Sequence, residues 1–391
     1  MRTVLVTGPG GAGRTTLAAA TALAAGPATR TLLISADPTD TLGAVLGTPT
    51  GHTPTGIAPG LTALRPDQAA AFRDDFLALQ QRSATALDLL GTAPFEADEL
   101  APLPGSAELA LLSALRDAAA GPFDLVVVDL PATVPALTAL ALPERLRRYL
   151  RRLLPPERQA ARALRPVLGR LAGVPVPAQW LYDAAGRWDL ELAGVQSVIE
   201  DPATTARLVV EPGAAGTEAL RTARMGLALH GVRVDAVLAN RVLPGGTAAG
   251  PLAALAASQR KALAEWGPQP GSPPAPYEIP HLGYEPRGTD DLAALAAPPP
   301  GPAGAGERGR VTDRLAEDGV LVWALPLPGA TRGELDLMRR GDELCVAAGP
   351  FHRVLELPSV LRRCTVAGAG LREGELRVRF APDPELWPRE R

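Results

Sequence analysis

The residues with the clearest chemical use form a glycine-rich stretch near the start of the chain, Gly8-Pro9-Gly10-Gly11-Ala12-Gly13-Arg14-Thr15-Thr16. Glycines let backbone N–H groups approach a polyphosphate, and a helix that begins after them directs more N–H groups and a positive dipole end there. In a phosphate-binding loop of this spacing, the hydroxyl of Thr15 would bind Mg²⁺. A lysine normally precedes that hydroxyl and reaches the outer phosphates, but here the residue is Arg14 and the only lysine is Lys261. The stretch predicts a nucleotide site in which a guanidinium replaces the usual ammonium.

Alternating strands and helices must position this stretch. The strand Thr3–Thr7 precedes the glycines, and Leu17–Ala20 opens a helix after them. Further apolar runs predict strands at 31–35, 123–129, 207–210 and 234–239, separated by helical stretches such as 68–91 and 216–230. Near-continuous apolar strands of this kind predict an α/β fold, a parallel sheet with helices on both faces. Together with the glycine-rich stretch between the first strand and helix, they predict a fold of the P-loop NTPase type. Ligands bind such sheets at the carboxyl ends of the strands.

Two aspartates follow strands at this same edge. Asp129 ends the strand 123–129, where a carboxylate would hold Mg²⁺ through water. Asp37 follows the strand 31–35, where it would accept a hydrogen bond from a water beside the terminal phosphate. The alternative for Asp37 is an N-cap of a helix from about residue 40, and both roles can hold together.

The glycine-rich stretch resembles the deviant P-loop of the ArsA ATPases, the arsenite-pump and tail-anchored-protein-targeting family, with the pattern G-K-G-G-x-G-K-T-T. The matching residues are Gly8, Gly10, Gly11, Gly13, Thr15 and Thr16, whereas Pro9 and Arg14 replace both lysines. The segment after the second strand resembles the first switch of the family, D-P-A-H-S-L, through Asp37, Pro38 and Leu42. At Asp129 the second switch of the family, D-T-A-P-T-G, keeps its aspartate but not its Thr and Gly positions.

Two later segments extend the resemblance to about residue 295, with weak coverage from 135 to 200. Asn240-Arg241-Val242 resembles the family motif N-[KR]-[VL], in which the Asn amide binds the adenine edge as both donor and acceptor. The alternative is that Asn240 is a turn residue at a strand end. The segment Pro280–Gly288 resembles the loop that closes over the base.

The resemblance implies a set of roles for these residues. Asp37 and Arg14 would be catalytic, and Thr15 and Asp129 would hold Mg²⁺. The nucleotide-binding residues would be Gly8, Gly10, Gly11, Ala12, Gly13, Arg14, Thr15, Thr16, Asn240 and Pro280. The cofactors would be ATP and Mg²⁺, both bound weakly because of Pro9 and Arg14. The chain would be a homodimer, although Pro9 removes the lysine that in the family reaches across the dimer.

The stretch 135–200 predicts a helical insertion that contains a basic helix at 144–154. Its arginines and leucines at helical spacing suit peripheral contact with an anionic membrane, or a solvated face that covers the ATPase core. In targeting members of the family this region builds a methionine-rich client groove. The whole chain has three methionines, so the sequence does not support such a groove here.

Residues 296–309 are rich in Pro, Gly and Ala and predict a linker. The short runs that follow alternate apolar and polar residues and predict a C-terminal all-β sandwich over 310–391. Leu327-Pro328-Gly329, Gly341-Asp342-Glu343-Leu344 and the final Gly374-Glu375-Leu376 resemble motifs of the α-crystallin domain of small heat-shock proteins. The resemblance implies that protein clients bind this domain.

Composition excludes several classes of protein. The net charge of −3 gives no electrostatic footprint for nucleic acid. The two cysteines, Cys345 and Cys364, fall outside the ATPase part, so the metalloid cysteines of the arsenite pump and the zinc-binding C-x-x-C of the targeting dimers are missing. No apolar run reaches the about 18 residues of a membrane span. With a first strand at 1–7 and no signal peptide before it, we expect a cytoplasmic protein.

Three functions stay open at this point. The first is an ArsA-type ATPase whose cycle opens and closes a dimer, with hydrolysis impaired by Pro9 and Arg14. The second is a pseudo-ATPase scaffold, and the third is a client-binding chaperone that acts mainly through the crystallin-like domain.

Overall fold

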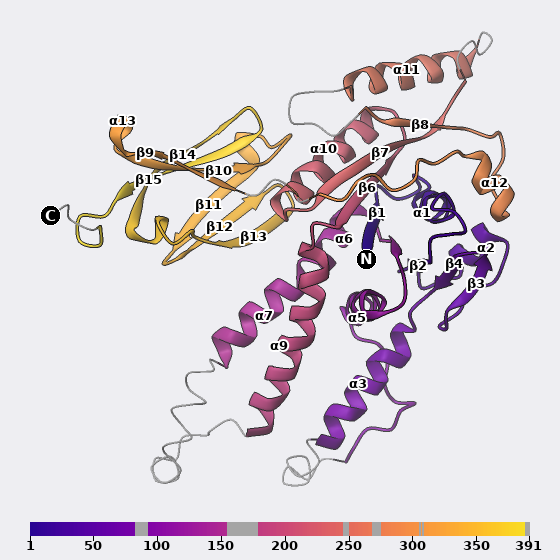
Figure 1. Cartoon of the computed structure of the whole chain (residues 1–391), viewed down its shortest axis with the longest axis horizontal. Helices are drawn as coiled ribbons and strands as arrows, with labels where there is room; N and C mark the ends of the chain where they lie inside the picture. Colours follow the sequence, from indigo (N-terminus) through magenta and orange to yellow (C-terminus); the bar gives the residue numbers. More distant parts are fainter. Residues whose placement is uncertain are drawn as a thin grey trace.

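The computed structural model describes residues 1–82, 93–154, 179–244, 250–267, 275–304, 306 and 309–387. An eight-stranded sheet with helices forms the N-terminal part, and two smaller antiparallel sheets form the C-terminal part (Figure 1). The end of the helix predicted at 68–91 and the middle of the predicted insertion 135–200 lie partly outside these residues.

The large sheet confirms the predicted α/β fold. Its strand order is β3-β4-β2-β5-β1-β6-β7-β8, and its pairs are parallel apart from β3 with β4. The strands are β1 (Arg2–Thr7), β2 (Thr31–Ser35), β3 (Thr55–Ala58), β4 (Leu61–Leu64), β5 (Leu125–Asp129), β6 (Thr204–Val210), β7 (Arg233–Val242) and β8 (Tyr277–Pro280). Residues of β2, β5 and β6 are buried throughout, which is why these strands read as continuous apolar runs.

Helices cover both faces of this sheet. Val4 and Val6 of β1 belong to the core on the face of α1 (Arg14–Leu23), α2 (Thr41–Leu46) and α12 (Gly288–Ala294). Leu5 points to the opposite core, which is covered by α5 (Ser106–Ala120), α6 (Thr133–Leu140) and α10 (Ala214–Leu229). The other long helices are α3 (Gln68–Arg82), α7 (Leu142–Leu153), α9 (Gln179–Glu200) and α11 (Pro251–Glu265). No helix of the described ranges is long and apolar enough to cross a membrane.

The C-terminal part contains a four-stranded sheet and a three-stranded sheet. The first has the order β14 (Cys364–Arg372), β15 (Glu375–Pro382), β10 (Val320–Pro326), β9 (Arg310–Arg314). The second has the order β11 (Leu335–Arg340), β12 (Glu343–Ala348), β13 (Phe351–Glu356), and a single-turn helix, α13 (Leu315–Asp318), follows β9. Alternating burial in β12 and β15 confirms the predicted two-residue period, whereas the exposed strands β9 and β14 lacked a clear apolar pattern.

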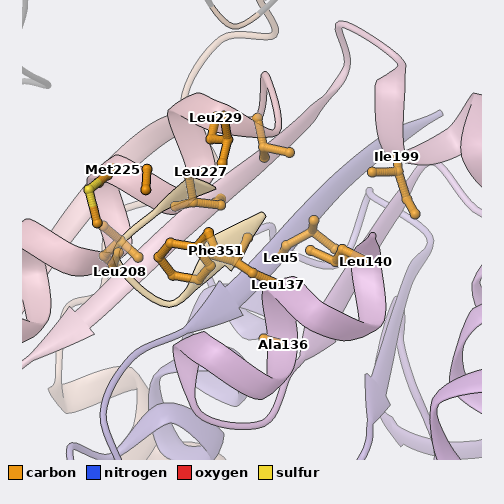
Figure 2. Packing of buried hydrophobic residues seen from close by; sticks show 14 of the residues in the cluster. Leu5, Ala136, Leu137, Leu140, Ile199, Leu208, Met225, Leu227, Leu229 and Phe351 are labelled. Carbon is orange, nitrogen blue, oxygen red and sulfur yellow. The ribbon is translucent and has the colours of Figure 1, made fainter. Parts of the chain in front are cut away.

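The two parts share one hydrophobic core. It runs from Leu5 in the large sheet to Phe380 in β15, and Figure 2 shows Phe351 of β13 lying among residues of the α/β part such as Leu137 and Leu227. The stretch 296–309, predicted as a linker, also contacts the large sheet, because the buried guanidinium of Arg207 donates to the carbonyls of residues 298 and 299 at 2.5 and 2.7 Å. The domain boundaries at 295 and 310 stay predictions.

The basic helix predicted at 144–154 is α7, and three of its arginines contact other parts of the protein, whereas Arg151 and Arg152 are exposed. Arg147 pairs with Asp189 of α9 at 3.0 Å, and Arg148 pairs with Glu343 of β12 at 2.6 Å. Arg145 donates to the carbonyl of His352 at 2.9 Å. These contacts favour the interpretation of α7 as a covering face over the interpretation as a membrane-binding helix.

Candidate nucleotide site

The parallel register brings the predicted site residues to one edge of the large sheet. Val6 of β1 and Ser35 of β2 are both register partners of Asp129, the last residue of β5. The loop after β1 leads into α1, and the loop after β2 carries Asp37. The strand ends therefore collect the glycine loop and both aspartates around one point, as the sequence predicts.

The glycine loop is tight on its inner side and open on its outer side. A Cβ at Gly8 would lie 1.9 Å from the Val209 carbonyl oxygen, and one at Gly13 would lie 2.3 Å from Asn240 Nδ2. Gly11 and Gly13 have φ angles of 80° and 88°, which L side chains rarely adopt. A Cβ at Gly10 or Gly11 would meet nothing within 4 Å. The loop thus presents bare backbone to open space, the arrangement that a phosphate group needs.

A hydroxyl and a carboxylate of the predicted Mg²⁺ site are in contact. Thr15 Oγ1 donates to Asp129 Oδ2 at 2.8 Å, and Ser35 Oγ donates to the same oxygen at 3.0 Å. Asp129 is 4% exposed, and burial raises the pKa of its carboxyl to about 6 despite these two hydrogen bonds. A buried carboxylate of this kind is stabilised in its charged form by a nearby cation.

The two side chains at this point suit Mg²⁺, which needs few protein ligands, better than a metal ion that is coordinated by protein side chains alone. Mg²⁺ keeps several waters and binds through one or two carboxylates plus substrate phosphates. Thr15 and Asp129 supply one hydroxyl and one carboxylate beside the open loop. Among the described residues, no group of three or more His, Cys, Asp or Glu side chains gathers to hold a metal.

Arg14 is near enough to both aspartates for its charge to act on their carboxyls. Its Nη1 donates to the Leu130 carbonyl oxygen, just after Asp129, at 2.6 Å. Its positive charge also helps to lower the pKa of Asp37 and partly opposes the rise that burial causes in the pKa of Asp129. The bond to Leu130 uses one of the five N–H donors of the guanidinium. The charge that replaces the usual lysine is thus present at the site, but it is tied to the second switch segment.

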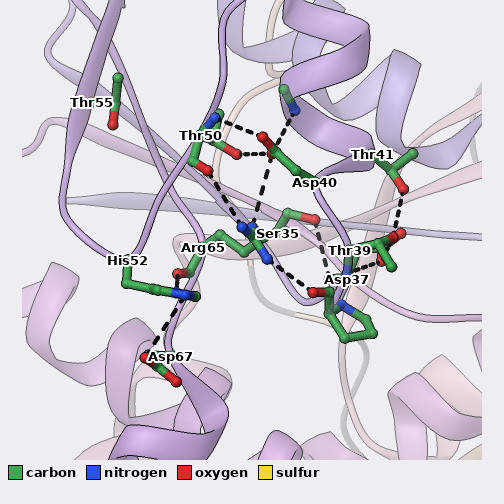
Figure 3. Close-up of polar contacts among 12 residues, drawn as sticks. Ser35, Asp37, Thr39, Asp40, Thr41, Thr50, His52, Thr55, Arg65 and Asp67 are labelled. Carbon is green, nitrogen blue, oxygen red and sulfur yellow. Dashed lines mark hydrogen bonds and ion pairs between the residues drawn. The ribbon is translucent and has the colours of Figure 1, made fainter.

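Asp37 and Asp40 both lie on the loop after β2, but their carboxylates accept hydrogen bonds from different groups (Figure 3). Asp37 Oδ1 accepts from the backbone N and the Oγ1 of Thr39 at 2.8 and 2.6 Å. Partial burial opposes ionisation of Asp37, but these bonds, Thr41 and Arg14 together hold its pKa below the usual value. Asp40, not Asp37, is the N-cap of α2, because its side chain accepts from the Gly43 N–H at 3.0 Å. The capping alternative for Asp37 is therefore wrong, and its carboxylate is ionised at the site.

Asn240 lies against the glycine loop. Its Nδ2 donates to the Ala12 carbonyl oxygen at 2.7 Å, and its Oδ1 accepts from the Arg241 N–H at 2.9 Å. The side chain is thus a brace between the end of β7 and the loop, and its contact with adenine stays a prediction. Pro280, the last residue of β8, is the register partner of Val242 and places the predicted base-covering segment beside Asn240.

Arg241 is a site residue to which the sequence analysis gave no role. It has a positive φ of 56°, its Nη1 donates to the Gly11 carbonyl oxygen at 3.1 Å, and it forms an ion pair with Glu211. Its position directly after Asn240 is the feature of the sequence that could have indicated a place at the site.

The sequence was compared with known protein families. The family described as anion-transporting ATPase, ArsA, matches residues 1–297. The chain belongs to the ArsA ATPase family. A second match, an HSP20-like domain found in ArsA, covers residues 318–380 and confirms the small-heat-shock-protein resemblance of the C-terminal part of this ArsA-family chain.

Similar proteins match this ArsA-family chain over nearly its whole length. An uncharacterised protein of Streptomyces coelicolor is 63% identical over 100% of both chains. A protein of Mycobacterium tuberculosis is 34% identical over 99% of this chain and 97% of its own. A putative arsenical pump-driving ATPase of Aquifex aeolicus is 26% identical over 97% of this chain and 99% of its own. These similarities thus span both the ArsA part and the HSP20-like part of this chain.

Proposed function

We propose that this protein binds Mg·ATP at the carboxyl edge of the large sheet and hydrolyses it slowly to ADP and phosphate. The observation that carries the proposal is the hydrogen-bonded contact of Thr15, Asp129 and Ser35 beside an open glycine loop. Backbone N–H groups of the loop and of the first turn of α1 would bind the phosphates. Mg²⁺, held by Thr15 and through water by Asp129, would neutralise charge on the phosphate oxygens.

Asp37 would orient the attacking water. Its carboxylate is ionised and lies on the loop after β2, so it can accept a hydrogen bond from water beside the terminal phosphate. Asn240 would hold the adenine edge and Pro280 would lie over the base, in addition to the bracing contact of Asn240 with Ala12. Relatives named as putative arsenical pump-driving ATPases support the reaction class.

Slow turnover follows from the replaced lysines. Arg14 is a planar fork on a long stem, and its contact with Leu130 competes with contact to the phosphates. Loss of one preorganised stabiliser of transition-state charge typically costs on the order of 10²–10³ in rate. We also propose that the protein is a cytoplasmic homodimer, as the family resemblance implies, without the cross-dimer lysine that Pro9 replaces.

The second candidate is a pseudo-ATPase scaffold or a client-binding chaperone that acts mainly through the HSP20-like domain. The loss of both lysines and the shared core of the two parts favour it. Under this alternative the nucleotide would bind without turnover and stabilise one arrangement of the two parts.

Calorimetry with Mg·ADP and a phosphate-release assay with Mg·ATP test the proposal. We expect binding at millimolar nucleotide, together with slow phosphate release that Asp37→Asn abolishes while binding persists. Thr15→Val should weaken binding in Mg²⁺ but leave any binding in EDTA unchanged. Absence of binding heat in the wild-type protein would overturn the nucleotide site, and binding without release would favour the pseudo-ATPase.

A further inference from the structure

Two side chains from one turn hold the peptide groups on either side of Asp37. Gln68 Nε2 donates to the Ala36 carbonyl oxygen at 3.3 Å. Arg65 Nη1 donates to the Pro38 carbonyl oxygen at 2.9 Å, and Figure 3 shows its guanidinium directed at this loop. The carbonyl groups of Ala36 and Pro38, the two neighbours of Asp37, thus both accept hydrogen bonds from side chains outside the loop.

The position of Arg65 follows from strand register. Leu64, the last residue of β4, is the parallel partner of Ile34 in β2, so the chain leaves both strands side by side. The Arg65 side chain is 15% exposed. Its Nη2 donates to the Thr50 carbonyl oxygen at 3.4 Å, and its Nε lies 3.9 Å from Asp40 Oδ1. One guanidinium therefore spans three points of the segment 38–50.

The hydrogen bonds that Asp37 itself receives from Thr39 come from its own loop and would move with that loop. The position of the carboxylate relative to the sheet therefore depends on the flanking peptides that Arg65 and Gln68 hold. Gln68 is also the first residue of α3, which packs against α5 and extends away from the sheet (Figure 1). A displacement of the start of α3 would therefore reach the Asp37 loop through Gln68, and Arg65 precedes the helix by three residues.

We infer that Arg65 and Gln68 are positioning residues that set the orientation of Asp37 and couple it to α3. The inference rests on the proposed role of Asp37 in ATP hydrolysis. Arg65 acts through backbone carbonyls and would not itself touch the nucleotide. A misplacement of the carboxylate by about 1 Å can lower the rate by on the order of 10²-fold.

Steady-state kinetics of Arg65→Met, Arg65→Lys and Gln68→Leu test the inference. Met keeps the apolar stem but no donor, so we expect kcat about 10–100-fold lower with KM within about twofold of wild type. Lys can reach the Pro38 carbonyl with one donor but cannot also span to Thr50. The kcat of Arg65→Lys should therefore lie between those of Arg65→Met and the wild type. Gln68→Leu should lower kcat less than Arg65→Met, because Gln68 has one of the contacts.

Arg30→Met is the matched control. Arg30 precedes β2 at its opposite end and pairs with Asp124 at 2.7 Å, away from the switch loop. The Arg30→Met variant should have the same kcat and KM as the wild type. An unchanged kcat in Arg65→Met, or a lower melting temperature without separate effects on kcat and KM, would overturn the inference.

Amide hydrogen exchange over residues 36–43 gives a measurement that does not need turnover. We expect faster exchange in Arg65→Met and not in Arg30→Met. If the wild-type protein releases no phosphate, the hydrolysis proposal fails, and this exchange result alone decides the positioning role. Equal exchange in the two variants would then overturn it.

Discussion

Phe351 of β13 lies so close to Gly226 of α10 that a Cβ at Gly226 would be 2.6 Å from the phenyl ring. The same Cβ would be 2.5 Å from Leu137 Cδ1 of α6. Phe351 is 4% exposed, and an ion pair between Arg353 and Glu144 at 3.1 Å flanks it. Since α6 begins at Thr133, directly after the Asp129 segment, the HSP20-like part rests on a helix that adjoins the proposed Mg²⁺ site.

Removal of the phenyl ring should loosen this contact. We expect Phe351→Ala to lower the free energy of unfolding by about 3–5 kcal/mol, because it leaves a cavity between α6, α10 and β13. Gly226→Val should lower it by about 1–3 kcal/mol, since the added carbons meet Leu137 and the ring. Urea unfolding followed by circular dichroism measures both.

Val366→Ala is the control for these two variants. Val366 lies on β14 and is 43% exposed, so its truncation should change the unfolding free energy by less than about 0.5 kcal/mol. Equal losses in Val366→Ala and Phe351→Ala would contradict a specific contact between the two parts. Protease sensitivity of the segment 296–309 should rise in Phe351→Ala and not in the control.

The sequence predicts the parts of the site that depend on local pattern. Continuous apolar runs located β2 and β5, and the glycine spacing placed the glycine-rich loop at the same sheet edge as Asp129, where its phosphate-binding role stays a prediction. The contact of Asn240 with Ala12 could not be predicted, because these residues lie 228 positions apart and meet only once β1 and β7 are in one sheet. Asp40 rather than Asp37 caps α2, a difference of three residues that no composition rule resolves.

Long-range polar contacts also escaped the sequence analysis. Arg207 lies inside an apolar strand and is 1% exposed, and its partners come from residues 28 and 91 positions away. Phe351 is the first residue of β13, whose sequence and burial do not alternate strictly, so the local pattern does not predict the surface against which its ring packs. These contacts depend on how two separately patterned parts meet.

Arg14→Lys tests the role of the replaced lysine. A compact ammonium can follow the phosphates without the bond from the guanidinium to Leu130, so we expect faster phosphate release, by up to on the order of 10²-fold. Arg14→Met should abolish release and weaken nucleotide binding. If the wild-type protein already turns over faster than Arg14→Lys, the explanation of slow hydrolysis is wrong.

Arg207→Met tests the buried ion pair beneath the segment 296–309. Its Nη2 lies 3.2 Å from Asp235 Oδ2, and both side chains are 1% exposed. The variant leaves Asp235 buried without this partner, so we expect a loss of about 3–5 kcal/mol in unfolding free energy. The double variant Arg207→Met/Asp235→Leu should recover part of that loss, because the fully buried carboxylate is removed together with its partner, and the recovery stays partial because Arg2, 3.7 Å from Asp235, also loses that carboxylate. A double variant less stable than Arg207→Met would contradict this account.

We expect the stability of the junction to depend on pH through His230. It lies at the end of α10, between cavities of about 320 Å³ and about 180 Å³ that both contact Arg353. Burial, with the charges of Arg353 and Arg145, lowers the pKa of His230 from 6.5 to about 3, although Glu144 and Glu200 also line these cavities. The folded protein therefore holds the imidazole neutral, while the unfolded chain binds a proton below pH 6.5.

The pKa of His230 is lower in the folded protein than in the unfolded chain. Protonation therefore favours the unfolded chain, and the free energy of unfolding is highest above about pH 6.5 and decreases as the pH falls toward 3. From this group alone we expect about 2 kcal/mol less unfolding free energy at pH 5 than at pH 7. Urea unfolding of His230→Gln should show a smaller decrease over that range, whereas His352→Gln, an exposed histidine in β13, should match the wild type. An unaltered pH dependence in His230→Gln would mean that the imidazole is protonated in the folded protein, and that the junction tolerates the charge beside Arg353.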